Sequence, residues 1–319
     1  MYTRGTTTVP HKSKLKTSNM SKIKGNFKKT WILYVFVLPP MLYLFILHYI
    51  PLYGIQIAFK NFKPAQGIWG SQWVGFKHFI TFFESYHFKS LLTNTLILSL
   101  YSLAAGFPIP ILLALILNYC RYPKLKKLVQ TVTYAPHFIS TVVFCGMIFI
   151  FLSVDGIVNQ FLTLLDIDPI LFMSKAEYFR HIYVWSGVFK GMGWSSIIYI
   201  ATLAGVSPDL HEAALVDGAT KLQRMFYIDL PSIIPTAVIL LILNAGQIMN
   251  VGFEKAFLLQ TPVNLQYSEI ISTYVYKTGI QSAQFSYSAA IGLFNNIINF
   301  ILLMSVNKFA KKVNGISLW

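Results

Sequence analysis

Charged residues are scarce in this sequence. Only 12% of its 319 residues are charged, with 11 acids against 26 bases, whereas a soluble domain carries about 25%. Cysteine is rarer still, and we expect Cys120 and Cys145 to be free thiols outside any disulfide framework. There is no GxxxxGK[ST] loop to bind ATP, no GxSxG and no CxxC. His211 and Glu212 open like the HExxH zinc motif, but Leu215 stands where its second histidine belongs, so we expect no metal site.

Long apolar runs take the place of the missing charges, since 55% of the residues are apolar. A helix needs about 20 such residues to cross the hydrocarbon of a bilayer. The runs that meet or nearly meet this length are 31–50, 91–118, 132–153, 182–204, 236–253 and 286–306. The sequence therefore predicts an all-α polytopic membrane protein with six transmembrane helices in residues 31–306. A basic tail at 1–30 precedes this domain, and a second tail at 307–319 follows it.

The basic residues gather in particular regions. Of the 26, 17 lie in the N-terminal tail, the 119–131 loop, the 205–235 loop or the C-terminal end. The positive-inside rule predicts that these regions and both termini are cytoplasmic. The apolar run after the tail is too long for a signal peptide, so we expect a solvated arm that fixes topology or, alternatively, adheres to anionic lipid. No folded basic domain is expected, so nucleic acid is not an expected partner.

The 205–235 loop carries signals for two short helices. Ser207, followed by proline, predicts the start of the first helix. Gly218 suits the left-handed conformation that ends a helix. Thr220, with a glutamine three residues later, is a capping-box signature for the second helix, and we expect Pro231 to end it. The interpretation that assigns no function to this loop is an ordinary surface helix pair that joins two spans.

A longer pattern occupies the same loop. Its residues are Glu212, Ala213 and Ala214, then Asp217, Gly218 and Ala219, then Phe226, Ile228, Leu230, Pro231 and Pro235. All of these positions match the EAA loop that the sequence resembles, which is found in permeases of ABC importers. The resemblance implies that the loop is a cytoplasmic element that couples the permease to an ATPase subunit. The coupling residues it implies are Glu212, Ala213, Ala214, Asp217, Gly218, Ala219, Phe226 and Pro231.

The likeness extends beyond the loop, from about residue 30 to the end. The segments 134–140, 190–194, 252–254, 273–280 and 317–319 are similar to carbohydrate permeases of the branch that imports complex oligosaccharides. The resemblance implies a type I importer fold in the bacterial cytoplasmic membrane. It also implies an assembly with a second homologous permease, two ATP-binding subunits and an extracellular solute-binding lipoprotein. The chain itself would bind no cofactor, since ATP and magnesium would be used by the partner ATPase. The alternative is a secondary transporter driven by an ion gradient.

Polar side chains inside the expected spans are candidates for lining a pathway, because polar groups in a membrane are costly unless they face a cavity or a partner. On a helix, Asn244, Gln247, Asn250 and Glu254 would lie on one stripe. Asn295 and Asn299 are one turn apart in the last span. Amides donate and accept hydrogen bonds, which suits sugar hydroxyls. The alternative is that they join neighbouring helices.

Two further features have open interpretations. Lys190 lies well inside the span at 182–204, between glycines in GxxxG spacing, which permits a close helix approach. It either faces the pathway, near an acidic sugar, or extends its ammonium to the outer surface. The aromatic residues of the 60–89 loop are either an interfacial belt or a docking surface for an extracellular binding protein.

Overall fold

The computed structural model describes residues 18–315, 317 and 318. The chain divides into two units, residues 1–56 and residues 57–319. Most of the predicted basic tail lies outside the described residues, but helix α1 (Ser18–Leu44) begins within it. It continues through η1 (Phe45–Tyr49), α2 (Ile50–Leu52) and η2 (Tyr53–Phe59), where η marks a π or 3-10 segment. The 30 residues of Thr30–Phe59 are long and apolar enough to cross a membrane.

The second unit is mostly helical, and its described residues also form a two-stranded antiparallel ribbon. Its elements are β1 (Lys60–Asn61), η3 (Pro64–Gln66), α3 (Gly67–Gly70), β2 (Gln72–Trp73), α4 (Lys77–Glu84), α5 (His87–Gly106), α6 (Pro108–Asn118), α7 (Pro123–Tyr134), η4 (Ala135–Phe138), α8 (Thr141–Phe151), α9 (Ile157–Thr163), η5 (Phe172–Ser174), α10 (Tyr178–Ala204), α11 (Pro208–Val216), α12 (Lys221–Arg224), η6 (Met225–Asp229), α13 (Leu230–Ala245), α14 (Phe253–Leu258), α15 (Leu265–Ser268), α16 (Ile271–Tyr276), η7 (Lys277–Gln281) and α17 (Phe285–Asn314).

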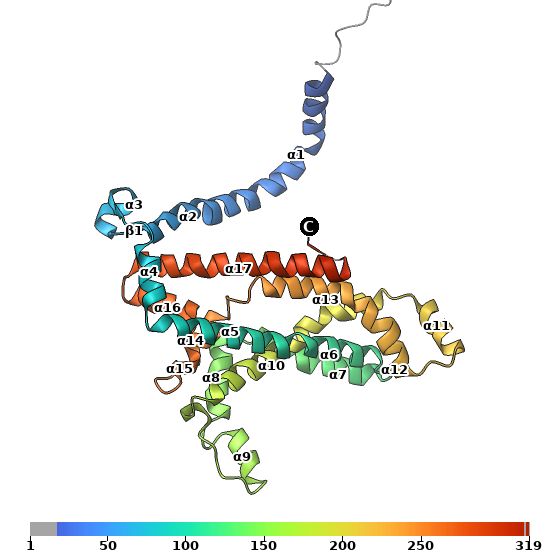
Figure 1. The fold of residues 1–319 in the computed structure, drawn as a ribbon. Helices are drawn as coiled ribbons and strands as arrows, with labels where there is room; N and C mark the ends of the chain where they lie inside the picture. Colours follow the sequence, from blue (N-terminus) through green and yellow to red (C-terminus); the bar gives the residue numbers. More distant parts are fainter. Residues whose placement is uncertain (1–17, 316, 319) are drawn as a thin grey trace, which may run out of the picture. The chain divides into compact units, whose positions relative to one another are not determined.

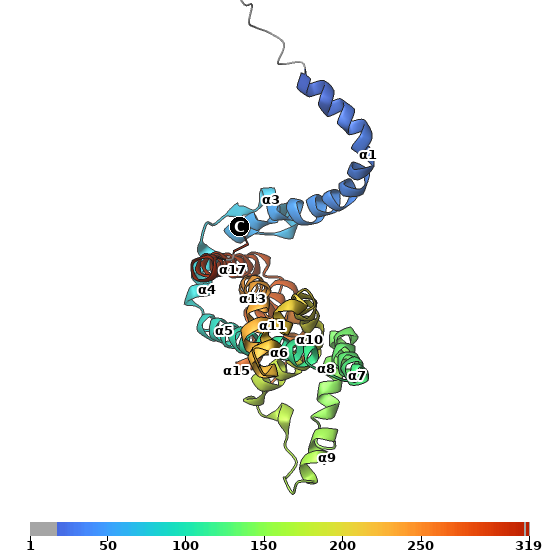
Figure 2. The same ribbon diagram turned by 90° about the vertical axis from the view of Figure 1, so that its right-hand side faces the viewer.

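Long helices that run side by side form the body of this unit (Figures 1 and 2). Helix α10 packs against α5, α6 and α13, and α13 packs against α17. One core cluster joins α6, α10 and α13 through buried side chains such as Leu115, Tyr199 and Ile233. Another joins α5, α8, α10 and α14, with Phe144 and Tyr183 among its members. These apolar contacts fix the relative positions of the helices that carry the polar candidates.

Four helical stretches within the described residues are long and apolar enough to cross a membrane, or five if a bent pair is one span. They include 87–118, 221–245 and 285–312. The span expected at 182–204 coincides with α10, which is 27 residues long but is not among the apolar stretches. The fold is therefore a polytopic helical one.

The continuous span expected at 132–153 is wrong. The chain forms two helical pieces there, 123–138 and 141–151, which meet at 106°. Ser140 begins the second piece as its N-cap, since its hydroxyl accepts a hydrogen bond from the Val143 N–H at 3.3 Å. A 3-10 turn that contains Pro136 ends the first piece. The N-cap at Ser140 therefore divides a segment that hydrophobicity alone predicted to be one continuous helix.

Two boundaries in the next span also differ from expectation. Pro231 does not end a helix, because the helical stretch continues from Lys221 to Ala245. The π turn of η6 precedes the proline, which stands in the first turn of α13. At its other end the helix stops at Ala245, short of the expected residue 253. The second helix of the predicted pair is therefore the start of a spanning helix.

The segment between α13 and α17 is irregular, and side chains of neighbouring helices satisfy its backbone. Asn299 accepts the Met249 N–H at 2.9 Å, and the Thr95 hydroxyl accepts the Ile271 N–H at 3.0 Å. Asn94 donates to the Gln266 carbonyl at 2.8 Å. Such bonds allow non-helical backbone to lie inside a membrane protein. This arrangement positions the short helix α14 against α8 and α10.

Candidate functional site

Helix α11 projects from one end of the helical unit (Figure 1). Its predicted start is confirmed: the Ser207 hydroxyl accepts the Asp209 N–H, and Pro208 is the first helical residue. Its predicted end is confirmed too, because Gly218 has a φ of 76°. The Gly218 N–H bonds to the Leu215 carbonyl at 3.1 Å, and the Ala219 N–H bonds to the Ala214 carbonyl at 2.8 Å. This pair of bonds is a complete Schellman motif.

The turn after Gly218 leads directly into the next helix. Thr220 and Gln223 form the predicted capping box, in which each side chain accepts the other residue's backbone N–H. The caps at Ser207, Gly218 and Thr220 depend on neighbouring residues alone, and the sequence was sufficient to predict them. The loop is a rigid helix and turn between α10 and the stretch that begins at Lys221.

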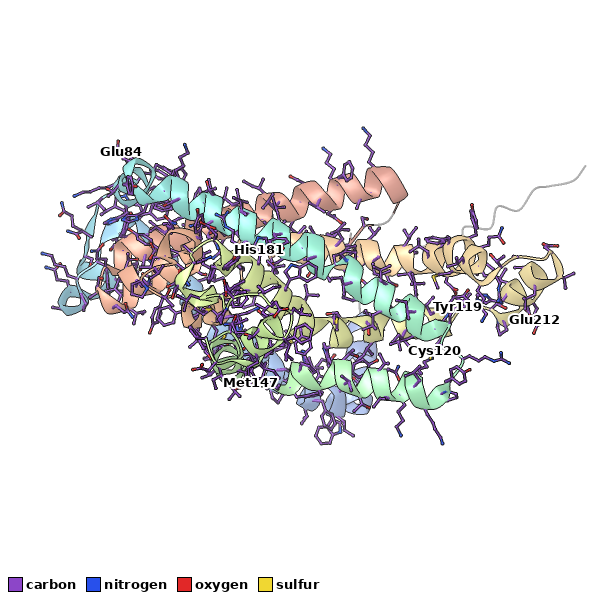
Figure 3. All side chains as sticks on the ribbon, turned by 90° about the horizontal axis from the view of Figure 1, so that it is seen from below. Glu84, Tyr119, Cys120, Met147, His181 and Glu212 are labelled. Atoms are coloured by element: carbon purple, nitrogen blue, oxygen red, sulfur yellow. The ribbon has the colours of Figure 1, made fainter. Side chains whose placement is uncertain are left out.

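The outer surface of α11 is exposed and partly apolar. None of its residues is buried, and the exposed fractions of Leu215 and Val216 are 54% and 89%. Glu212 is also exposed. In Figure 3 it lies near the end of the unit where Tyr119 lies, opposite to Glu84. Of the other implied coupling residues, Ala213, Asp217, Gly218, Phe226 and Pro231 are exposed and Ala214 and Ala219 are half-buried.

A buried carboxylate that the sequence did not indicate as a site lies beneath α11. Asp229 in η6 is fully buried. Its Oδ2 accepts the Tyr119 hydroxyl at 2.5 Å, and its Oδ1 lies 3.3 Å from Nε2 of His211 in α11. Burial and the bond to Asp229 raise the pKa of the Tyr119 phenol above its ordinary value. Arg224 approaches the ring of Tyr119, with its guanidinium carbon 6.0 Å from the centroid.

This cluster joins the end of α6, which is distant in the sequence, to helix α11 and to the start of the next spanning helix. The His211 contact with Asp229 is an ion pair when the imidazole is protonated. Within the described residues no hydrogen bond of good geometry reaches Oδ1, so the His211 imidazole is the polar group that faces this oxygen. The sequence signal for this cluster was the position of Asp229 next to an apolar run, because an acid in a membrane span is costly unless it is paired.

The second candidate site is a cavity of about 660 Å³ inside the helical unit. Residues of α5, α6, α10, α13 and α14 line it, together with the turn between α13 and α14. Three of the predicted pathway residues, Asn244, Gln247 and Asn250, are among them. They do not form a helical stripe, because the helix ends at Ala245 and the last two lie in the turn.

Two other predicted pathway residues do not line this cavity. Asn295 donates to the Asn250 side chain at 2.9 Å, and Asn299 accepts the Met249 N–H at 2.9 Å. Both are buried on α17. Their hydrogen bonds join α17 to the turn that carries Asn250, which is the kind of contact between segments that the alternative interpretation predicts.

Lys190 also lies outside the cavity lining. Its ammonium donates to the Thr141 hydroxyl at 3.3 Å and stands 5.3 Å from the centroid of the Phe144 ring. Lys255 of α14, which the sequence did not single out, lines the cavity instead. The spacing of the glycines around Lys190 predicted a close approach of two helices. In the structure Gly187 instead leaves room for the Lys255 side chain, because a Cβ on Gly187 would lie 3.0 Å from the Lys255 ammonium nitrogen.

Long apolar helices around an internal cavity whose lining includes three amides and a lysine, with an exposed helix at one end, are typical of a membrane permease. The chain belongs to the family of binding-protein-dependent transport system inner membrane components, whose profile matches residues 106–315. It is therefore a multi-pass permease subunit of an ABC importer and a transport component, not an enzyme. This membership decides against the ion-gradient alternative.

Relatives cover most of the chain. It is 44% identical over 281 residues to the polygalacturonan/rhamnogalacturonan transport system permease protein YteP of Bacillus subtilis, and the match covers 88% of each chain. It is 41% identical over 281 residues to Protein LplB of the same organism, again over 88% of each. The arabinooligosaccharides transport system permease protein AraP of Bacillus subtilis is 27% identical over 291 residues and 88% of each chain.

Solved structures show the same fold. One is a chain of a bacterial ABC transporter involved in the import of the acidic polysaccharide alginate, with a TM-score of 0.84 and 39% identity. Another is the bacterial alginate transporter in complex with an alginate pentasaccharide-bound periplasmic protein, with a TM-score of 0.85 and 38% identity. Each match covers 92% of this chain and 99% of the other.

Proposed function

We propose that this chain forms half of the translocation pathway of an ATP-driven oligosaccharide importer and couples to an ATPase through the 205–235 loop. The observation that carries the coupling role is helix α11, which has no buried residue yet is capped at both ends. The relatives named for polygalacturonan, rhamnogalacturonan and arabinooligosaccharide transport support a sugar substrate. The cavity with its amide lining offers hydrogen bonds of the kind that hydroxyls need.

The assembly we propose contains a second homologous permease, two ATP-binding subunits and an extracellular solute-binding protein. ATP and magnesium act in the ATP-binding subunits, since this sequence has no phosphate-binding loop. The exposed Leu215 and Val216 suit a hydrophobic contact with such a subunit. Glu212, which has no ion pair among the described residues, is available for a basic residue of the ATPase.

The proposed topology has six spans and cytoplasmic termini, with α10 and the bent α7–α8 pair counted as spans. The hydrogen bond between Tyr119 and Asp229 supports it, because it joins the α6–α7 turn to the α11 loop at one end of the unit. Both regions belong to the basic set that the positive-inside rule assigns to the cytoplasm. Glu84 lies at the opposite end (Figure 3).

Cysteine labelling tests this topology. In a background without Cys120 and Cys145, we expect Lys14→Cys and Lys311→Cys to resist an impermeant thiol reagent in intact cells, whereas Lys175→Cys reacts. The bilayer excludes the charged reagent from the cytoplasm, so reactivity reports the side on which each residue lies. Permeabilised cells supply the control, in which all three cysteines should react. Labelling of both termini from outside would overturn the orientation.

Truncating Glu212 tests the coupling role. A tag on this chain should purify a second permease and an ATPase from native membranes, and proteoliposomes of that complex should show sugar-stimulated ATP hydrolysis. Loss of one partner of an interfacial charge pair costs about 2–5 kcal/mol, so Glu212→Ala should weaken ATPase docking and abolish stimulation. The affinity of the binding protein for sugar should not change. Exposed Glu84, at the other end of the unit, supplies the matched control as Glu84→Ala. If Glu212→Ala and Glu84→Ala both keep the wild-type level of sugar-stimulated ATP hydrolysis, the coupling role of Glu212 is refuted.

A further inference from the structure

Among the described residues that line the cavity, Lys255 is the only charged one, and no carboxylate accompanies it there. Its ammonium donates to the backbone carbonyl of Tyr183 and stands 4.5 Å from the centroid of the Tyr183 ring. Neither contact carries a negative charge. Within the described residues, the ion pairs are His211–Asp229 and Lys277–Glu269, so no described carboxylate, the neighbouring Glu254 included, forms an ion pair with Lys255.

The fold holds this ammonium at a defined place. Lys255 is half-buried, on the short helix α14 that packs against α8. Gly187 of α10 leaves the space that the ammonium fills, because a Cβ there would lie 3.0 Å from Nζ. The Tyr183 hydroxyl in turn donates to the Gly252 carbonyl at 3.3 Å, just before α14 begins. The lysine is therefore seated by α10 and does not extend freely into solvent.

An ammonium that the fold holds in place without a counter-ion is suited to bind an anion. Removing a charge from water is costly unless an opposite charge accompanies it. An ammonium has three donors, of which one is used on Tyr183. A neutral sugar would accept hydrogen bonds from the others but would leave the charge uncompensated. A carboxylate would satisfy both the donors and the charge.

From this geometry, and resting on the proposed importer function, we propose that Lys255 binds a sugar carboxylate and makes the pathway selective for uronate-containing oligosaccharides. The amides of Asn244 and Gln247 line the same cavity and serve the sugar hydroxyls. Lys255 is thus a specificity-determining residue, and the amides supply general polarity.

The test compares one saccharide in two charge states. Uptake of a galacturonate oligosaccharide and of its methyl ester is measured in proteoliposomes of the complete complex with its binding protein. Lys255→Met should lower uptake of the acid by about tenfold to a hundredfold, as loss of a charged hydrogen bond does, and should change uptake of the ester less than about twofold. Lys255→Arg should keep most of the acid uptake. Each variant is compared with the wild type on one substrate, so the preference of the binding protein cancels.

A chemical rescue supplies a second readout if the wild type does not transport the ester. Lys255→Cys, in a background without the native cysteines, should regain acid uptake with an aminoethyl thiosulfonate, which restores an ammonium. It should not regain uptake with the uncharged methyl reagent. Exposed Lys308 on α17 supplies the matched control, since Lys308→Met should transport as the wild type does.

Other outcomes would overturn the proposal. Equal losses on acid and ester would make Lys255 structural or a partner of the second permease. Full acid uptake by Lys255→Met, or wild-type transport of neutral sugars alone, would remove the carboxylate site and leave the importer function intact. A wild-type complex whose ATPase responds to no saccharide would instead contradict the proposed function itself.

Discussion

Replacing Gly218 with proline should abolish sugar-stimulated ATP hydrolysis and uptake. Gly218 has a φ of 76°, whereas proline fixes φ near about −65°. Proline also lacks the N–H that bonds to the Leu215 carbonyl at 3.1 Å. A proline in a helix interior costs about 3 kcal/mol or more, and a comparable loss here corresponds to at least about a hundredfold. The measurement is ATP hydrolysis by the complex in proteoliposomes, with and without sugar and binding protein.

Two other substitutions at this position separate conformation from packing. No atom lies within 4 Å of a Cβ placed on Gly218, so any effect of a side chain comes from the backbone alone. Asparagine tolerates the left-handed conformation, and Gly218→Asn should keep most of the coupling. Gly218→Ala should be intermediate, because that conformation costs other residues about 1–2 kcal/mol. If Gly218→Pro couples as well as Gly218→Asn, the left-handed turn is not required.

The caps of α11 could be predicted because a few neighbouring residues determine them. Ser207, Gly218 and Thr220 each form a hydrogen bond with a backbone group two or three residues away, and each has a side chain or a lack of one that suits that role. The family also followed from this loop, whose fixed spacing is specific. Composition was sufficient for the apolar helices, since a membrane span is defined by length and hydrophobicity.

The cavity could not be predicted in the same way, because contacts distant in sequence shape it. The helix that carries Asn244 stops at Ala245, and Asn299 on α17 accepts a backbone N–H of the turn that follows. Lys255 reaches Tyr183, which lies 72 residues earlier. Periodicity assumes a continuous helix and therefore assigned Gln247 to a stripe that does not exist. The same assumption hid the break near Ser140.

Replacing His211 with alanine should release α11 from the helical unit. Asp229 is fully buried and its Oδ1 faces His211 at 3.3 Å, so the variant leaves one carboxylate oxygen without its partner. Breaking a buried ion pair from one side costs about 3–5 kcal/mol. Helix α11 would then move independently of the spanning helices, and ATPase motion would not reach the pathway. We expect a lower melting temperature of the purified complex and at least about a tenfold loss of sugar-stimulated ATP hydrolysis.

The double variant His211→Ala with Asp229→Asn distinguishes a stranded charge from lost packing. Asparagine keeps the shape of the side chain and removes its charge, so the double variant should be more stable than His211→Ala alone. Tyr119→Phe removes only the hydroxyl that bonds to Oδ2 at 2.5 Å and should cost about 1.5–3 kcal/mol, less than His211→Ala. Strict additivity of the His211 and Asp229 effects would show that the two residues do not interact. In that case the rigidity of α11 would depend on its caps and on the turn at Gly218, and the Gly218 variants alone would govern coupling.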